Sequence, residues 1–306
     1  MKILILSQDS EFNYNKRLHG DFLRLLKKTH GAIIADHSMT YKEFKSLYET
    51  VKPDVFITYN SNGSSKGKRN YERFIKQECK IKYAKCKKFH ITTDFLREGE
   101  DQKDISWFSE MGYDQAIFRH KSSLNYDVGI DTFWLPFSIN RRLFLDNSDK
   151  AFSRRSKSLS FCGSYSSKSV YPLRNRAIEV FLRHKKLNIS KKRLIDQDYV
   201  RFLSGSMISL TCGGKCRYFT AKYMEILASG SFMICGETDG LEMLPEGSYF
   251  SFDENNIAES LNKAYEIFAC PNKFEPVVKD AKNYVLVKHN NEKRARQFLK
   301  NMEKYL

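Results

Sequence analysis

The sequence is poor in residues that interrupt regular structure, with only 6 prolines and 15 glycines among 306 residues. This scarcity excludes low-complexity linkers, and no segment repeats at the period of a solenoid protein. No apolar run approaches the roughly 20 residues of a membrane span, and the run at residues 3–7 is too short for a signal peptide. Because 41% of the residues are hydrophobic, we expect a compact globular protein of the cytoplasm.

Two nucleotide-binding motifs are also missing. The turn after the first apolar run reads Ser-Gln-Asp-Ser-Glu-Phe-Asn over residues 7–13, and the first glycine is Gly20. A nicotinamide or flavin site of the G-x-G-x-x-G type needs glycines here, so that the backbone can approach a pyrophosphate. The sequence also has no G-x4-G-K-[ST] loop, which argues against P-loop ATPases.

Cysteine is the remaining scarce residue that bears on function. The seven cysteines are irregularly placed, and no second pair or histidine cluster joins Cys212 and Cys216 to complete four zinc ligands. We therefore expect no metal site. Without a secretion signal, the cysteines are expected to be free thiols in a reducing compartment.

Positive charge, by contrast, is abundant. Lys and Arg number 52 against 36 Asp and Glu, a formal charge of +16, which favours an anionic partner such as a nucleotide, a nucleic acid or an acidic lipid surface. Ten of the basic residues lie between residues 66 and 88. Arg73, Lys76 and Lys80 would follow one side of a helix there and are candidates to bind an anionic acceptor. The alternative is a solvated helix face.

Short apolar runs alternate with helical patterns along the whole chain, which predicts an α/β fold. Strands are expected near residues 2–6, 32–35, 54–59, 88–92, 115–119, 132–136, 158–162, 207–211, 231–235 and 249–252. Helices are expected near residues 17–29, 41–51, 71–84, 105–111, 172–184, 197–203, 221–229 and 256–269. The polar stretch 145–157 divides them into two Rossmann-like, doubly wound parallel-sheet domains, 1–150 and 151–290, which face a central cleft where ligands would bind. A helix in 291–306 is expected to return to the first domain.

The most informative segment is residues 212–236. Thr220 can cap a helix that ends at Gly230, and the amino end of such a helix attracts phosphate. Lys222 and Glu225 lie three residues apart on one face, which would put a cation beside a diphosphate and a carboxylate near ribose hydroxyls. The alternative is an ion pair on the helix surface.

This segment, with residues 238–247, resembles the donor site of GT-B glycosyltransferases of the group 1 type, particularly those related to the spore-maturation protein CgeB. The resemblance implies a nucleotide-sugar pocket that is lined by Lys222, Glu225, Gly240, Leu241 and Glu242. The runs at residues 160–164 and 171–174 look like the first strand and helix of that family's second domain, and residues 134–140 with Phe144 look like the closing strand of its first domain. Gly163, Lys168 and Arg174 are therefore also expected near the donor.

The sequence departs from the family pattern at one position. Many retaining enzymes of this fold have a second glutamate eight residues before the ribose-binding one, and Arg217 stands there instead. Retention and inversion of configuration both stay open. Arg217 either contacts the diphosphate or faces solvent.

The candidate catalytic base lies in the first domain. Asp94 follows an expected strand and would face the cleft, although an aspartate after a strand is commonly a helix cap. His120 follows the next strand, and it either reaches a sugar or phosphate or lies on the surface. His90 lies within a strand and is expected to be structural.

These features lead to an expected function. The chain would transfer a sugar from a nucleotide-diphosphate sugar, such as a UDP- or GDP-sugar, to a hydroxyl of a glycan or lipid-linked acceptor, without a metal or a separate cofactor, and with peripheral contact at the inner membrane surface. One alternative is a glycosyltransferase that modifies hydroxymethylated DNA bases. The other is a non-enzymatic, basic nucleic-acid-binding protein.

Overall fold

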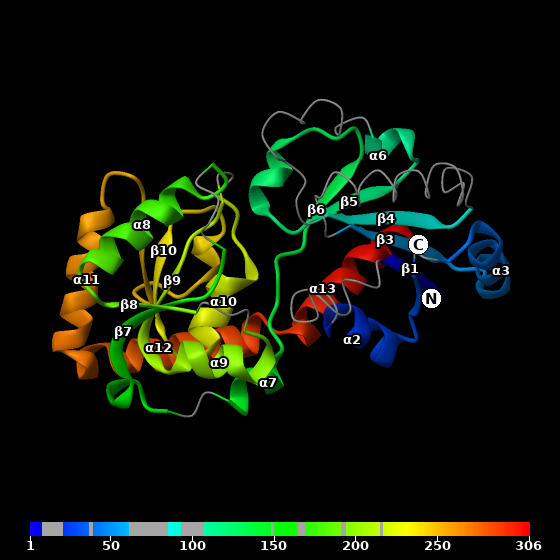
Figure 1. The fold of residues 1–306 in the computed structure, drawn as a ribbon. Helices are drawn as coiled ribbons and strands as arrows, with labels where there is room; N and C mark the ends of the chain where they lie inside the picture. Colours follow the sequence, from blue (N-terminus) through cyan, green and yellow to red (C-terminus); the bar gives the residue numbers. More distant parts are fainter. Residues whose placement is uncertain are drawn as a thin grey trace. The chain divides into compact units, whose positions relative to one another are not determined.

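The structure is a computed structural model that describes residues 1–7, 21–36, 39–60, 85–92, 107–147, 150–164, 169–190, 194–214 and 217–306. These residues form two compact units: the first comprises Met1–Phe137 and Asn291–Leu306, and the second Ser138–Asn290. Each has a parallel sheet between layers of helices, so the predicted α/β class with two parallel sheets is confirmed (Figure 1). The expected basic helix over residues 71–84 lies outside the described ranges.

The sheet of the first unit has six parallel strands in the order β2-β1-β3-β4-β5-β6. The strands are β1 (Ile3–Ser7), β2 (Ile33–Asp36), β3 (Val55–Asn60), β4 (Lys87–Thr92), β5 (Gln115–Phe118) and β6 (Asp131–Trp134). Every residue of β1 and β5 is buried, because helices cover both faces of the sheet. Continuous apolar runs therefore identify these strands better than alternation would.

Two pairs of helices enclose this first sheet. The described helical elements are α2 (Asp21–His30), α3 (Tyr41–Val51), α6 (Trp107–Glu110), η4 (Lys121–Asn125), α13 (Asn291–Met302) and η7 (Glu303–Tyr305). α2 and α13 lie side by side on one face, where the rings of Phe22 and Phe298 are 5.8 Å apart (Figure 1). α3 and α6 pack on the other face through Phe44 and Phe108. The C-terminal helix thus completes the core of the first unit, with Ala295, Phe298, Leu299 and Met302 all buried.

The sheet of the second unit has five parallel strands in the order β11-β10-β9-β7-β8. They are β7 (Ser156–Phe161), β8 (Leu187–Ile189), β9 (Ser206–Thr211), β10 (Phe232–Gly236) and β11 (Tyr249–Phe252). The two sheets have the same strand order when the strands are counted within each unit. The second strand lies on one side of the first, and the third and later strands follow one another on its other side. The strand order of the second sheet therefore reverses between β7 and β9, and ligands of open α/β sheets bind outside the carboxyl ends of strands at such a point.

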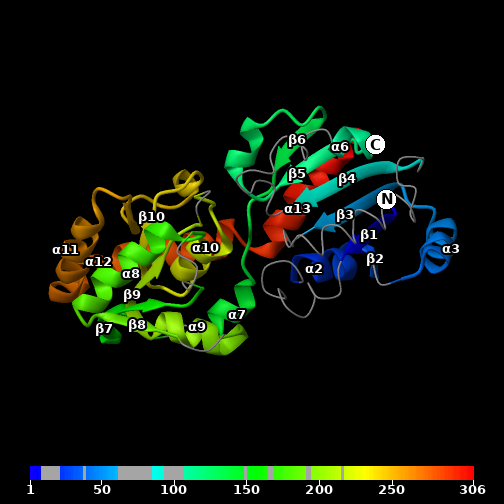
Figure 2. The same cartoon turned by 45° about the horizontal axis from the view of Figure 1, so that its top comes forward.

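Helices also cover both faces of the second sheet. They are α7 (Arg141–Leu145), η5 (Phe152–Arg154), α8 (Pro172–Arg183), α9 (Asp196–Ser204), α10 (Ala221–Ala228), η6 (Leu241–Met243), α11 (Ile257–Ala269) and α12 (Pro271–Lys288). α8 and α11 lie together on one face (Figure 2). α9, α10 and the carboxyl-terminal half of α12 pack on the other face, so the apolar core has two layers.

The division between the units lies at Ser138, earlier than the residue 151 expected from the polar stretch. The reason is α7, whose Phe144 is buried with Tyr199 and Leu203 in a core layer of the second unit.

β8, α7 and α12 are elements that the sequence patterns do not predict. α12 has a proline inside the helix, Pro276, and leaves Tyr284 exposed, which obscures its amphipathic pattern.

The described residues contain no helix that is both long enough and apolar enough to cross a membrane. Their cysteines are free thiols. These are Cys86, Cys162, Cys212, Cys235 and Cys270.

Candidate functional site

The candidate site lies at the carboxyl edge of the second sheet, where its strand order reverses. Three loops meet there: residues 162–164 after β7, 212–214 after β9 and 237–240 after β10. The first turn of α10 follows the second of these loops in the chain. Three of the nine donor-site residues expected from the sequence belong to these segments: Gly163, Lys222 and Gly240.

Lys222 and Gly163 are brought together at this edge. The Nζ of Lys222, in the first turn of α10, donates a hydrogen bond of 2.6 Å to the backbone oxygen of Cys162. A Cβ placed on Gly163 would lie 2.5 Å from that Nζ. Glycine therefore leaves the room that the ammonium group occupies, and a cation stands at the end of β7.

Glu225 lies one turn further along α10 and is only 3% exposed. The hydroxyl of Tyr199, on α9, donates a hydrogen bond of 2.9 Å to its Oε2. A surface ion pair with Lys222 does not fit a carboxylate that is buried to this extent. Tyr199 carries no motif, so the sequence analysis did not identify it as a partner of Glu225.

The start of α10 differs in one detail from the expectation. Thr220 occupies the N-cap position with an extended backbone, but its side chain makes no capping hydrogen bond. The hydroxyl of Tyr223 instead accepts a bond of 3.1 Å from the amide of Gly213 and donates one of 3.1 Å to the oxygen of Gly236. Burial raises the pKa of Tyr223 well above its ordinary value, so the hydroxyl stays neutral. It ties together the ends of β9 and β10.

Arg174 is buried near the start of α8 and joins two of the loops. Its Nε donates to the oxygen of Cys212 at 3.0 Å, and its Nη1 donates to the oxygen of Ser164 at 2.6 Å. The guanidinium also lies 3.8 Å from the ring centroid of Tyr171. Burial lowers its pKa, although the group remains charged near neutral pH. Backbone carbonyl groups of the site thus already accept hydrogen bonds from this arginine.

Arg217 forms an outer part of the same region. It lies 3.2 Å from a carboxylate oxygen of Glu254 and 3.7 Å from one of Glu237, and its side chain is half exposed. Gly240 donates its amide to Glu242 at 2.9 Å, and Leu241 between them is buried. Gly240, Leu241 and Glu242 therefore form a self-capped turn after β10.

The residues expected to act from the first unit are described only in part. His120 is 3% exposed, and its ring centroid lies 5.5 Å from that of Phe137, so it is not a surface residue. His90 is buried and bonds to the Thr58 hydroxyl at 2.6 Å, as a structural histidine would. The others lie outside the described residues: Asp94, Arg73, Lys76, Lys80 and, in the second unit, Lys168.

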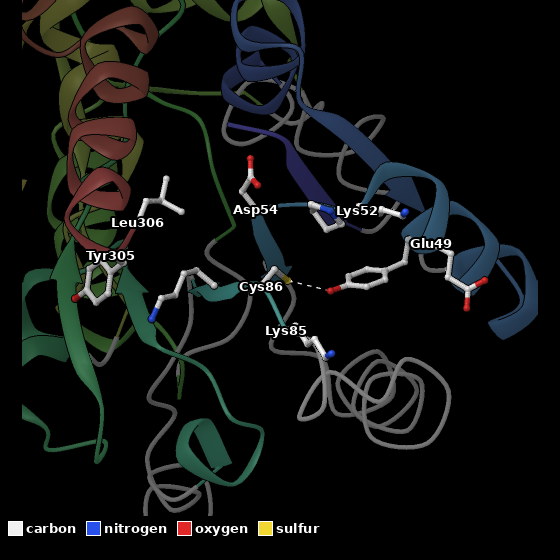
Figure 3. Close-up of a pocket in the computed structure, with 10 residues that line it drawn as sticks. Glu49, Lys52, Asp54, Lys85, Cys86, Tyr305 and Leu306 are labelled. Carbon is white, nitrogen blue, oxygen red and sulfur yellow. Dashed lines mark hydrogen bonds between the residues drawn. The ribbon is translucent and has the colours of Figure 1, made fainter.

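A cavity of about 640 Å³ in the first unit lies elsewhere (Figure 3). Its walls include the residues that precede β3 and β4, among them Asp54 and Lys85. The Tyr48 hydroxyl lies 3.2 Å from the sulfur of Cys86, which Figure 3 labels. The cavity is therefore at the amino edge of the sheet, opposite to the edge where open α/β sheets bind ligands.

The site can offer positive charge and backbone donors to a phosphorylated ligand. Within the described part of the chain, no group of three or more His, Cys, Asp or Glu residues could hold a metal ion. Two cations of this edge are described: Arg174, which joins the loops after β7 and β9, and Lys222, in the first turn of α10.

Known proteins match this chain in family and in fold. Residues 163–300 match the family model described as glycosyl transferase-like. None of the curated proteins matches the sequence.

Solved structures match the chain over its whole length. Sucrose-phosphate synthase from Thermosynechococcus elongatus is 11% identical with a TM-score of 0.70, and the match covers 100% of this chain and 99% of that one. HepE from Anabaena, in complex with UDP, is 12% identical with a TM-score of 0.65 over 99% and 100%. An alpha-glucosyltransferase in complex with UDP-glucose and DNA is 12% identical with a TM-score of 0.65 over 99% of both chains. Residues 163–300 therefore form a glycosyl transferase-like domain, and the chain as a whole has the GT-B fold of these solved structures.

Proposed function

We propose that this glycosyltransferase moves a hexose from a nucleoside-diphosphate sugar to an acceptor hydroxyl, and that the donor binds at the carboxyl edge of the second sheet. The observation that carries the proposal is the placement of the Lys222 ammonium in the space left by Gly163. It puts a fixed cation beside the start of α10, where the amide groups favour a diphosphate.

The chemistry follows from the charge that develops on the leaving group. When the glycosidic bond to the diphosphate breaks, negative charge grows on its oxygens, and Lys222 stabilises that charge. The reaction on this view needs no metal ion. Glu225 accepts hydrogen bonds from the ribose hydroxyls, and Tyr199 holds its carboxylate in place. Asp94 remains the proposed base if the reaction inverts configuration.

UDP-sugars are the preferred donors in this proposal. HepE has been solved with UDP and with UDP-glucose, and the similar alpha-glucosyltransferase has been solved with UDP-glucose. At 11–12% identity these likenesses concern the fold, so the nucleotide and the sugar are matters for experiment.

A glycan or lipid-linked acceptor in polysaccharide synthesis at the cytoplasmic membrane surface is the first candidate for the acceptor. Duplex DNA is the second, because the chain has a formal charge of +16 and the similar alpha-glucosyltransferase was solved with DNA. Salt-dependent DNA binding without any nucleotide-sugar binding would instead favour the nucleic-acid-binding alternative.

A thermal-shift panel of UDP- and GDP-sugars tests the donor. A true donor at 100 times its dissociation constant should stabilise the fold by about 2.7 kcal/mol. Lys222→Ala should then lower the turnover of that donor about 100-fold. Lys157→Ala, an exposed change near the other end of β7, is the control and should leave turnover unchanged. Equal turnover in the two variants would contradict the proposed role of Lys222.

A further inference from the structure

An unpaired arginine lies at the carboxyl edge of the first sheet. Arg119 directly follows β5, and its backbone amide donates to the oxygen of Thr92 at 3.2 Å. Its side chain is 1% exposed, yet none of its three nitrogens has a hydrogen-bond partner within the described part of the chain. A buried charge without partners is costly, so such a group points to a missing acceptor.

Aromatic rings provide the described surroundings of this guanidinium. Its central carbon lies 4.6 Å from the ring centroid of Phe137 and 5.6 Å from that of Phe22. Ring faces attract the cation but do not accept the ordinary hydrogen bonds of its five N–H groups. Burial lowers the pKa of Arg119, as expected where no carboxylate compensates for the lost water.

A second buried arginine approaches from α13. Arg294 is 7% exposed and donates to the oxygen of Phe137 at 3.2 Å and to Gln297 at 2.7 Å. Burial and the positive charge of Arg119 lower its pKa to about 9. Arg119 contacts the ring of Phe137 and Arg294 its carbonyl, so two cations converge on one residue.

Buried side-chain donors without hydrogen-bond acceptors are confined to one stretch of the described chain. The buried side-chain atoms without partners all belong to residues 119–134: besides the guanidinium, they are the Ser123 hydroxyl and the Trp134 indole nitrogen. Guanidinium and indole N–H groups only donate hydrogen bonds. A ligand that satisfies this stretch must therefore be rich in acceptor oxygens and negatively charged.

We propose that Arg119 and Arg294 form an anion site that binds a phosphate or carboxylate group of the acceptor substrate. The paired guanidinium groups suit either anion, because both present two oxygens to N–H donors. The identification of the ligand as the acceptor rests on the proposed function, whereas the anion site itself does not. This site lies in the first unit and shares no residue with the donor site in the second.

Thermal unfolding of the full chain in sodium phosphate and in sodium chloride of the same ionic strength and pH tests the site. Phosphate should raise the Tm of the wild type by several degrees. Arg119→Met should have a higher Tm than the wild type in chloride, because it removes an unpaired buried charge, and should lose the response to phosphate. A lower Tm in chloride, with the phosphate response kept, would overturn the proposal.

Two control variants separate this site from others. Arg155→Met removes a buried arginine of the second unit whose three nitrogens each donate a hydrogen bond, and it should keep the phosphate response. Lys222→Ala should also keep that response but lose stabilisation by UDP, while Arg119→Met should keep stabilisation by UDP. A phosphate response lost in Lys222→Ala and kept in Arg119→Met would overturn the anion site. If no nucleotide sugar raises the Tm of the wild type, the donor proposal is refuted, but the test of the anion site with phosphate still holds.

A hexose phosphate, a hexuronate and the neutral hexose distinguish the two anions. The charged sugar that fits should stabilise the wild type at concentrations at least about ten-fold lower than the neutral one does. Equal responses to all three sugars would overturn the assignment to the acceptor. If Arg119→Met does not fold, Arg294→Gln decides the question: it should need about ten-fold more phosphate than the wild type, and an unchanged requirement would overturn the site.

Discussion

The two units share one strand order, but within the described chain one buried arginine of the first unit lacks the hydrogen-bond partners that the buried arginines of the second unit have. In the second unit, Arg155 donates to the oxygens of Lys150 and Ser229 and to the Ser231 hydroxyl, and Arg174 donates to loop carbonyls. In the first unit, Arg119 has no such partner in the described chain. A guanidinium whose three nitrogens all donate hydrogen bonds within the protein stabilises its own fold, whereas one without such partners is suited to a ligand.

The largest effect that the comparison predicts is on the stability of the second unit. Arg155→Met should lower the free energy of unfolding by about 3 kcal/mol, because two carbonyls and a hydroxyl lose a charged donor. Both tryptophans, Trp107 and Trp134, belong to the first unit, so their fluorescence follows that unit while circular dichroism follows both. Urea unfolding should shift by circular dichroism more than by fluorescence. A shift seen only by fluorescence would mean that Arg155 stabilises the first unit and not the second.

The next largest expected effect is on donor affinity, which depends on the buried carboxylate of Glu225 on α10. Glu225→Gln should weaken binding of the donor about ten- to a hundred-fold, because the amide offers ribose hydroxyls a weaker acceptor than the carboxylate. Tyr199→Phe removes only the supporting hydrogen bond and should weaken binding a few-fold. Calorimetry with the nucleotide sugar measures both. A larger loss in Tyr199→Phe than in Glu225→Gln would mean that the carboxylate serves the fold.

Two glycines of the donor edge should separate stability from function. A Cβ on Gly213 would lie 2.8 Å from the backbone oxygen of Tyr218, so Gly213→Ala should cost about 2 kcal/mol of stability. A Cβ on Gly163 would meet the far end of the long Lys222 side chain, which can shift, so Gly163→Ala should keep its stability and bind the donor more weakly. Urea unfolding and calorimetry on both variants test this. An equal loss of stability in the two variants would show that Gly163 serves the fold and not specifically the placement of Lys222.

The smallest effect concerns thiol reactivity. Burial raises the pKa of Cys212 to about 11, so at pH 8 roughly one thiol in a thousand is ionised and able to react. Iodoacetamide followed by peptide mapping should label the exposed Cys270 well before Cys212. Arg174→Gln should speed labelling of Cys212, because the arginine holds the loop that contains it. No change in that variant would show that the loop stays closed without it.

Sequence patterns located most of the strands because parallel strands are continuous apolar runs, as β1 and β10 illustrate. They did not locate β8, which has only three residues and follows two lysines. The donor region was visible because Lys222 and Glu225 have a fixed spacing on α10. Arg119 was not identified, since one basic residue after a strand in a chain with 52 of them carries no signal until its burial is known.

Hydrogen–deuterium exchange of the full chain, with and without the nucleotide sugar that stabilises it most, tests the central claim most directly. We expect slower exchange in peptides that cover residues 162–164, 212–214 and the first turn of α10, and unchanged exchange over residues 115–134. Slower exchange confined to residues 115–134, with the second unit unaffected at saturating ligand, would contradict the placement of the donor site.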